Sequence, residues 1–164
     1  MATVTITITD LDLVAEDFNV DFLATGNEID NGQATAAYFT GYFMYGLVNT
    51  PEFTAGVAAF GRELCDRLNK QGVVDLPKMK STVVLTMEDV DLNTGQFKPT
   101  LEIHSGEPHG ERLPSIAEIV GVHMRNLLNK PEFVAQVWDY AKEYSRTHDN
   151  CVVANLDHAA DKAA

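Results

Sequence analysis

Basic residues are missing from the first 61 positions of the chain, because no lysine or arginine occurs before Arg62. The 164 residues hold 12 basic and 24 acidic side chains, and the net charge of −12 divides evenly between residues 1–80 and 81–164. Such a field repels nucleic-acid phosphates and anionic membranes. We therefore expect no direct binding to nucleic acid or to a membrane, although an acidic surface also serves plain solubility.

Cysteine and long apolar runs are also scarce. The two cysteines, Cys65 and Cys151, are too few for a disulfide framework and have no C-x-x-C spacing. No apolar run approaches the roughly 20 residues that span a bilayer. The N-terminus has no basic region of the kind that opens a signal peptide. These absences favour a cytoplasmic protein, and an apolar content of 45% is that of an ordinary globular protein.

Several sequence motifs of catalysis are missing as well. The chain has no phosphate-binding glycine loop, no G-x-S-x-G sequence, no H-E-x-x-H helix and no dinucleotide-binding fingerprint. We therefore expect a protein that is not an enzyme and has no cofactor, with a divalent cation left open.

What the chain does contain is a repeat. Thr82–Thr86 repeats the pattern of Thr3–Thr7 at an offset of 79 residues, and Asn129–Val137 repeats Asn49–Val57 at an offset of 80. Self-similarity at a fixed period identifies the unit that folds. Because an isolated unit would leave apolar surface uncovered, we expect the two repeats to form one compact domain. The predicted boundaries are 1–76 for the first repeat, 82–156 for the second and 157–164 for a tail.

Each repeat is predicted to begin with a β-hairpin. Residues 3–9 alternate threonine with valine or isoleucine, which is the period of a strand with one apolar face. The apolar parity then changes at Asp10 and, in the second copy, at Asp89, which indicates a β-bulge or the end of the strand. Pro99 predicts that its strand lies at a sheet edge or is irregular.

Two helices are predicted to follow each hairpin. Residues 33–49 are uncharged and apolar on nearly every side, which predicts a helix buried on more than one face. Ser115 and Glu118 fit a capping box at the start of its counterpart. Pro51 and Pro131 occupy the first turn of the second helices.

The shared core should involve close contact between the repeats. Gly41 and Gly121 occupy equivalent mid-helix positions, which predicts two backbones crossing closely at a pseudo-twofold axis. The apolar segments 73–76 and 152–156 are predicted to be third strands or extended arms. The fold class is therefore α+β: an internally duplicated β-β-α-α unit forms a pseudo-twofold two-layer domain, with antiparallel hairpins in a four-stranded sheet and helices packed on one face.

Asp10, Asp12, Asp89 and Asp91 are the only acidic pattern that both copies share. Four carboxylates would suit a hard cation such as Ca²⁺ or Mg²⁺. The spacing lacks the glycine and the distal glutamate of an EF-hand loop. The pattern favours the alternative, in which these are solvated turn residues that end a strand and protect its edge.

Two groups of histidines occur in the second half only. His104 and His109 lie near carboxylates, which would suit zinc binding or general-base chemistry. His148, Asp149 and Cys151 form a second group that could provide a nucleophile. The first group has no counterpart in the first repeat, and the second has no identifiable third partner. Drift of loop residues is therefore the favoured interpretation of both.

Tyr38, Tyr42 and Tyr45 give the first long helix more aromatic surface than a small core needs. Aromatic side chains are enriched at protein interfaces, which makes this helix a candidate interaction surface. The equal alternative is core packing between the repeats. Glu16 and Asp17, in the acidic first hairpin, form the second candidate surface.

These features favour a non-catalytic acidic module that acts through protein–protein contact, with a partner whose surface is basic or accepts aromatic side chains. Two alternatives stay open. One is a decoy that mimics nucleic acid and occupies a DNA-binding protein or nuclease, and the other is small-ligand or divalent-metal binding in the groove between the repeats. The sequence leaves open the identity of the partner and the choice between monomer and homo-oligomer.

The threonine-rich first strand and the compact acidic build resemble, in general character, small accessory or inhibitor proteins of bacteriophages. This resemblance implies a location in the host cytoplasm. It also implies that the partner is a host factor or another phage protein.

Overall fold

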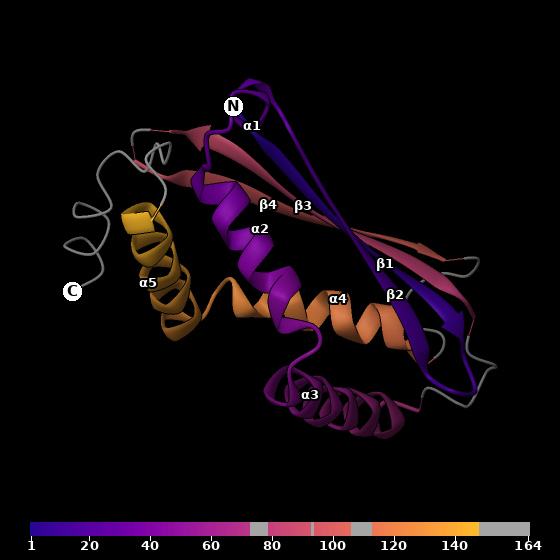
Figure 1. Ribbon diagram of the computed structural model, residues 1–164. Helices are drawn as coiled ribbons and strands as arrows, with labels where there is room; N and C mark the ends of the chain where they lie inside the picture. The colour runs from indigo at the N-terminus through magenta and orange to yellow at the C-terminus, as the bar shows by residue number, and fades with distance from the viewer. Residues whose placement is uncertain (73–78, 93, 106–112, 148–164) are drawn as a thin grey trace.

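The fold combines a four-stranded antiparallel sheet with five helices in the described residues (Figure 1). The computed structural model describes residues 1–72, 79–92, 94–105 and 113–147. The α+β class and the antiparallel four-stranded sheet predicted from the sequence are therefore confirmed. In chain order the elements are β1 (Thr3–Asp12), β2 (Asp17–Thr25), α1 (Asn27–Asp30), α2 (Ala36–Leu47), α3 (Pro51–Lys70), β3 (Ser81–Asp91), β4 (Gln96–Ser105), α4 (Ile116–Leu127) and α5 (Pro131–Thr147).

The strand order β2-β1-β3-β4 places the first strands of the two hairpins side by side at the centre of the sheet. The pairing of β1 with β3 is centred on Ile6 and Leu85. Each hairpin has a register shift directly after an aspartate, Asp10 in one and Asp89 in the other. These shifts confirm the predicted bulges, and the position of β4 at an edge confirms the prediction from Pro99.

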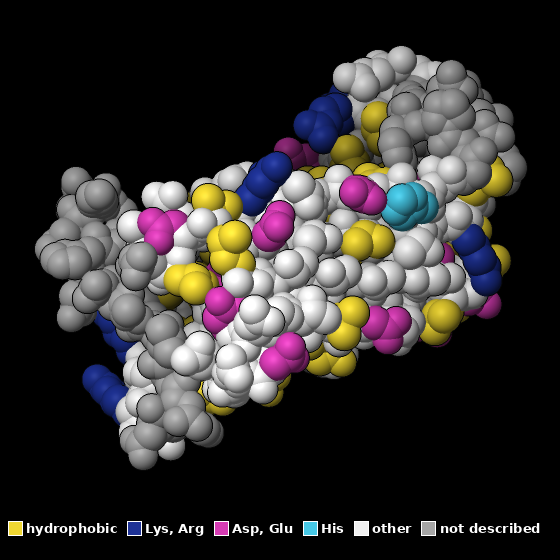
Figure 2. All heavy atoms as spheres, turned by 90° about the horizontal axis from the view of Figure 1, so that it is seen from above, with side chains coloured by type: hydrophobic (Ala, Val, Ile, Leu, Met, Phe, Trp, Pro, Cys, Tyr) yellow, Lys and Arg dark blue, Asp and Glu magenta, His cyan; other side chains and the backbone are white. Residues whose placement is uncertain are grey.

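One face of the sheet is buried and the other is open. Side chains alternate between the two faces of a strand, so every second residue of β1 and β3 enters the core. The threonines between them are half-buried on the opposite face. Figure 2 shows this outer face, on which acidic side chains are spread among threonine and backbone atoms. The fully buried strand side chains are Val4, Ile6, Ile8, Val83, Leu85 and Met87.

The long helices lie on the buried side of the sheet in two tiers (Figure 1). Helix α2 packs against β1 and α4 packs against β3, while α3 packs on α4 and α5 packs on α2. Helices on one face of the sheet were predicted, whereas the second tier was not. None of the helices in the described ranges has both the length and the apolar character needed to cross a membrane.

The helices begin at residues that satisfy their first backbone N–H groups. The Thr35 hydroxyl caps α2, and the Thr50 hydroxyl caps α3, which has a proline in its first turn. At α4 the Ser115 hydroxyl accepts from the Glu118 N–H while the Glu118 carboxylate accepts from the Ser115 N–H. The predicted capping box is therefore confirmed.

Asp10 is buried at the end of β1, with 3% of its surface exposed. One carboxylate oxygen accepts the Ser81 N–H at 2.8 Å and the other accepts the Ala117 N–H at 2.9 Å. Ala117 lies in the first turn of α4, where a negative charge also interacts favourably with the helix dipole. Asp10 therefore ties the end of β1 to the start of β3 and to the start of α4.

Asp89 makes the corresponding contacts at the other end of the β1–β3 pair. It is 2% exposed, and its carboxylate accepts the N–H groups of Ala2 and Ala37, each at 3.1 Å. Ala37 lies in the first turn of α2. The interpretation of Asp10 and Asp89 as solvated turn residues is therefore wrong, because both are buried acceptors that join residues far apart in the sequence.

Gly41 and Gly121 let the first-tier helices approach the sheet closely. A Cβ atom added at Gly41 would overlap Cγ1 of Val4 and lie 3.1 Å from Cε of Met87. One added at Gly121 would overlap Cγ1 of Val83. The neighbours of both glycines are strand side chains, whereas the sequence had suggested a crossing of two backbones.

Candidate functional site

Tyr38, Tyr42 and Tyr45 gather around Phe22 of β2. The ring centroid of Phe22 lies 6.1 Å from those of Tyr38 and Tyr42 and 5.6 Å from that of Tyr45. Tyr38 and Tyr42 stack on each other at 5.8 Å with an interplanar angle of 10°. Tyr42 is 44% exposed and Tyr45 is 39% exposed, so the group is packed on one side and open to solvent on the other.

The aromatic contacts continue from α2 to α5. Tyr140 stacks on Tyr42 at 6.3 Å, and Tyr144 meets Phe39 edge-on at 5.4 Å. Aromatic pairs in these geometries contribute about 0.5–1.5 kcal/mol each beyond the area that they bury. The result is a rigid, partly exposed aromatic strip across three elements. Its members are Phe22, Tyr38, Tyr42, Tyr45, Tyr140 and Tyr144.

The aromatic strip is uncharged. Burial raises the pKa of the Tyr38 hydroxyl, and the neighbouring Tyr144 and Tyr42 raise it further. Burial and the same neighbourhood raise the pKa of Tyr140. The phenols therefore stay protonated at neutral pH and can both donate and accept hydrogen bonds. Charge beside the strip comes from the hairpin that joins β1 to β2.

A hollow of about 500 Å³ lies beside the aromatic strip, between β2 and the junction of α2 with α3. Asp17 and Tyr45, which the sequence proposed as separate candidate surfaces, both line it. Val48 and Thr54 lie on its helical side. The two predicted surfaces therefore meet at one place, which we call the acidic hollow.

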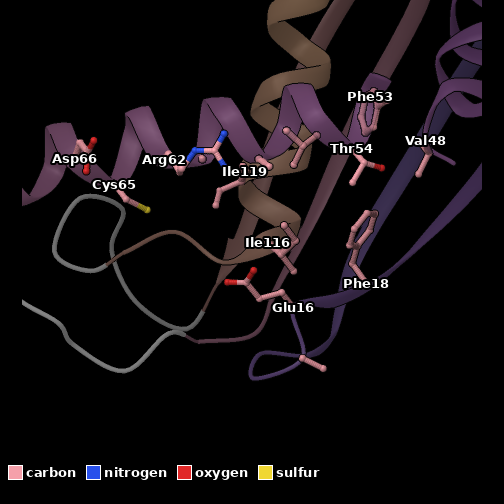
Figure 3. Close-up of a pocket in the computed structure, with 14 residues that line it drawn as sticks. Glu16, Phe18, Val48, Phe53, Thr54, Arg62, Cys65, Asp66, Ile116 and Ile119 are labelled. Carbon is pink, nitrogen blue, oxygen red and sulfur yellow. The ribbon is translucent and has the colours of Figure 1, made fainter. Parts of the chain in front are cut away.

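A second cavity, of about 600 Å³, adjoins the acidic hollow and shares Phe18, Val48 and Thr54 with it. It lies between α3, the start of α4 and the β1–β2 turn, and we call it the α3 cavity (Figure 3). Apolar side chains form much of its lining, among them Phe18, Ile116 and Ile119. Charged lining residues are Glu16, Arg62 and Asp66.

The aromatic strip, the acidic hollow and the α3 cavity form one continuous region, which we call the first-hairpin surface. It combines ordered aromatic side chains, a recess with apolar walls and charged residues around it. Protein interfaces have an apolar, aromatic centre and a polar rim, and a few anchors in pockets supply most of the binding energy. All five residues predicted for interaction lie in this region.

The four aspartates proposed as metal ligands lie at two distant places. Asp10 and Asp12 are at one end of the β1–β3 pair, and Asp89 and Asp91 are at the other. The backbone N–H groups of Ala15 and Val14 hold the pKa of the Asp12 carboxyl below its usual value. Across the described ranges, no group of three or more histidine, cysteine, aspartate or glutamate side chains is placed to hold a metal ion.

The histidine candidates are described only in part. His104 lies exposed on β4 with its Nε2 3.4 Å from the Glu102 carboxylate. His109, His148, Asp149 and Cys151 fall outside the described residues.

His123 is a buried histidine of α4 that sequence reasoning missed. It lies between the rings of Phe53 and Phe60 of α3, at centroid distances of 5.5 and 5.7 Å. Burial lowers the pKa of its imidazole, and the nearby charge of Lys130 lowers it further. The spacing that places it opposite the apolar stripe of α3 was present in the sequence as a signal.

Comparisons with protein-family models, with curated proteins and with solved structures gave no match. The geometry of the first-hairpin surface is therefore the basis for a functional assignment.

The α3 cavity itself was also missed by sequence reasoning. A recess requires knowing which helix lies opposite the hairpin, and α3 packs on α4, which is far from it in sequence. One signal was present: position 58 is alanine where the equivalent position 138 is tryptophan. A small residue opposite a large one at equivalent positions marks a space that one repeat fills and the other leaves open.

Proposed function

We propose that the chain is a non-catalytic protein-binding module and that the first-hairpin surface is its binding site. The single observation that carries this proposal is the junction of the partly exposed Tyr42 and Tyr45 with two adjoining recesses lined by Glu16 and Asp17. Such a surface suits a partner that presents both basic and apolar or aromatic side chains.

The proposal includes internal duplication as the origin of the scaffold. The offset of 79 residues that relates Thr3 to Thr82 also relates Asp10 to Asp89. It converts the register of the first hairpin into that of the second, and the register of β1 with β3 into itself. The N–H groups that the two buried aspartates bind are related by the same offset or by 80. These matches support a pseudo-twofold arrangement of two copies.

Duplication and binding have separate roles in this proposal. The buried aspartates, the capping residues and the glycines of the first-tier helices belong to the scaffold in both copies. The binding surface belongs to the first copy and to the α5 residues that pack against it. A scaffold held by buried contacts keeps the exposed aromatic side chains ordered before a partner arrives, which lowers the entropic cost of binding.

The test is affinity capture from the native host with the full chain as bait. The wild type is compared with a Tyr42→Ala, Tyr45→Ala double variant and with Val90→Ala. Val90 is 56% exposed on β3, outside the first-hairpin surface, so it is a matched control for loss of an exposed apolar side chain. We expect the double variant to capture at least about tenfold less partner, since anchor residues contribute about 2 kcal/mol or more each. Equal capture by all three proteins would refute the proposed site.

A further inference from the structure

Trp138, the single tryptophan of the chain, lies against the turn between β3 and β4. A Cβ atom added at Gly95 in that turn would lie 3.1 Å from Cη2 of the indole and 3.6 Å from Cβ of Ala36. The indole of α5 therefore occupies the space between the second hairpin and the start of α2.

The same three positions in the first half line the α3 cavity. The offsets of 79 and 80 residues relate Gly95 to Glu16, Ala36 to Ile116 and Trp138 to Ala58. Glu16, Ile116 and Ala58 all line that cavity.

The turn backbone matches as well. Gly95 has φ of 67° and Glu16 has φ of 54°, and Glu16 is the one non-glycine residue with positive φ in the part of the chain that the structure describes. A glutamate in this conformation is unusual, because it normally favours glycine. The first half thus keeps the turn and the framework but has a methyl group where the second half has an indole.

We propose that the α3 cavity receives an aromatic side chain of the protein partner, with the indole of tryptophan as the preferred occupant. This inference rests on the proposed function, and it names the chemistry that the first-hairpin surface recognises. The cavity volume of about 600 Å³ lies within the range of about 300–1,000 Å³ typical of ligand sites, which leaves room for a ring and its neighbouring residue.

The cavity lining suits an aromatic ring. Phe18, Val57 and Ile119 provide apolar contacts, and the Arg62 guanidinium is placed at the same recess, where such groups stack on aromatic faces. Asp66 adds a carboxylate that would attract a basic residue next to the ring. Continuity with the aromatic strip extends the contact beyond a single side chain.

The experiment measures binding of N-acetyl-tryptophanamide to the full chain by methyl NMR. We expect the methyl resonances of Ile116, Ile119 and Val57 to shift saturably with a Kd in the millimolar range. N-acetyl-leucinamide, an apolar probe without a ring, is the matched control and should leave these resonances in place. Absence of shifts with the tryptophan probe, or equal shifts with both probes, would overturn the inference.

Two variants test the site itself. Ala58→Trp should fill the cavity with the chain's own indole and abolish the probe shifts, and its melting temperature should not fall. Ala59→Trp places the same side chain on the next residue of α3, which does not line the cavity, and should retain binding. Retained binding in Ala58→Trp would contradict the proposed location.

A third variant applies the comparison in reverse. Trp138→Ala should open the corresponding space in the second half, so that the number of bound probes per chain rises from one to two. An unchanged stoichiometry in a folded Trp138→Ala protein would contradict the structural equivalence on which the inference is based.

The probe measurements use no partner, so their failure is distinguishable from failure of the proposed function. If the probe binds as described, Ala58→Trp should also reduce partner capture at least tenfold relative to Ala59→Trp. Unreduced capture would overturn the assignment of the occupant to the partner protein and leave a site for free aromatic molecules.

Discussion

The first and second halves of the molecule agree in the contacts that hold the sheet to the helices and differ in the side chains at the periphery. Both have a bulge after a buried aspartate, and both have a glycine where the first-tier helix meets the sheet. The pair Ala58 and Trp138 differs, and so does the pair Phe43 and His123. The contrast indicates that buried polar contacts constrain a position more strongly than the filling of an edge recess does.

The largest expected effect concerns the feature that the halves have in common. Asp10→Ala and Asp89→Ala should each lower the free energy of unfolding by about 2–5 kcal/mol, because each leaves two buried backbone N–H groups without an acceptor. Urea unfolding of both variants measures the effect.

The control for these variants is Asp12→Ala. Its carboxylate is exposed and accepts from the turn N–H groups of Val14 and Ala15, so its loss should cost well under half as much. A cost for Asp12→Ala equal to that for Asp10→Ala would show that burial of the aspartates is not the source of the stability. Very unequal costs for Asp10 and Asp89 would break the comparison between the halves.

The next effect concerns the feature that the halves do not share. Trp138→Ala should lower the free energy of unfolding by about 2 kcal/mol, which is less than the 3–5 kcal/mol of a fully buried aromatic because the indole is half-buried. Ala58→Gly, the truncation at the equivalent position, should cost about 1 kcal/mol, as expected for helix propensity alone. Equal costs in thermal or urea unfolding would mean that the indole is not packed in its recess.

A smaller effect is expected at the glycines between helix and sheet. Gly41→Ala and Gly121→Ala should each lower the free energy of unfolding by about 1–2 kcal/mol, since the added methyl group would overlap a valine of the sheet. Gly46→Ala, in the same helix as Gly41, meets no atom within 4 Å and should raise stability by up to about 1 kcal/mol. A loss of stability in Gly46→Ala comparable to that in Gly41→Ala would contradict the packing argument.

The smallest expected effect is on the pH dependence of stability. Burial depresses the folded-state pKa of His123 below its unfolded value, so the unfolded state binds the proton more readily. The stability from this residue is present above the unfolded pKa of about 6.5 and falls as the pH drops through the folded pKa.

His123→Phe gives this position the residue that Phe43 provides in the other half, and it should remove that part of the pH dependence. The change expected between pH 7.5 and 5 is below about 1 kcal/mol. Denaturant unfolding across this range measures it, and an identical pH profile in the variant would show that His123 does not contribute.

Much of the fold could be predicted because local signals and tertiary structure agree. The alternation of residues 3–9 predicted a strand, Ser115 and Glu118 predicted a helix start, and Pro99 predicted an edge strand. Each of these signals depends on chemistry within a few residues. The second tier of helices could not be predicted, because it depends on which helix of the other half is the neighbour.

The burial of Asp10 and Asp89 was missed although the sequence contains a signal for it. Asp10 continues the inward parity of Val4, Ile6 and Ile8, so the bulge comes one residue later than the apparent change of phase. A carboxylate on the inward face was interpreted as solvated because its partners are backbone N–H groups of distant segments, which have no sequence signature. The candidate residues Tyr45, Asp17 and Glu16 were found, but their convergence on one surface required the fold.

The most direct test of the account is hydrogen exchange of the full chain with and without the captured partner. We predict protection of the β1–β2 hairpin, the C-terminal half of α2 and the part of α3 that lines the cavity, with no change on the outer face of β3 and β4. Protection concentrated on that outer face, with the first hairpin and α3 unchanged, would contradict the account.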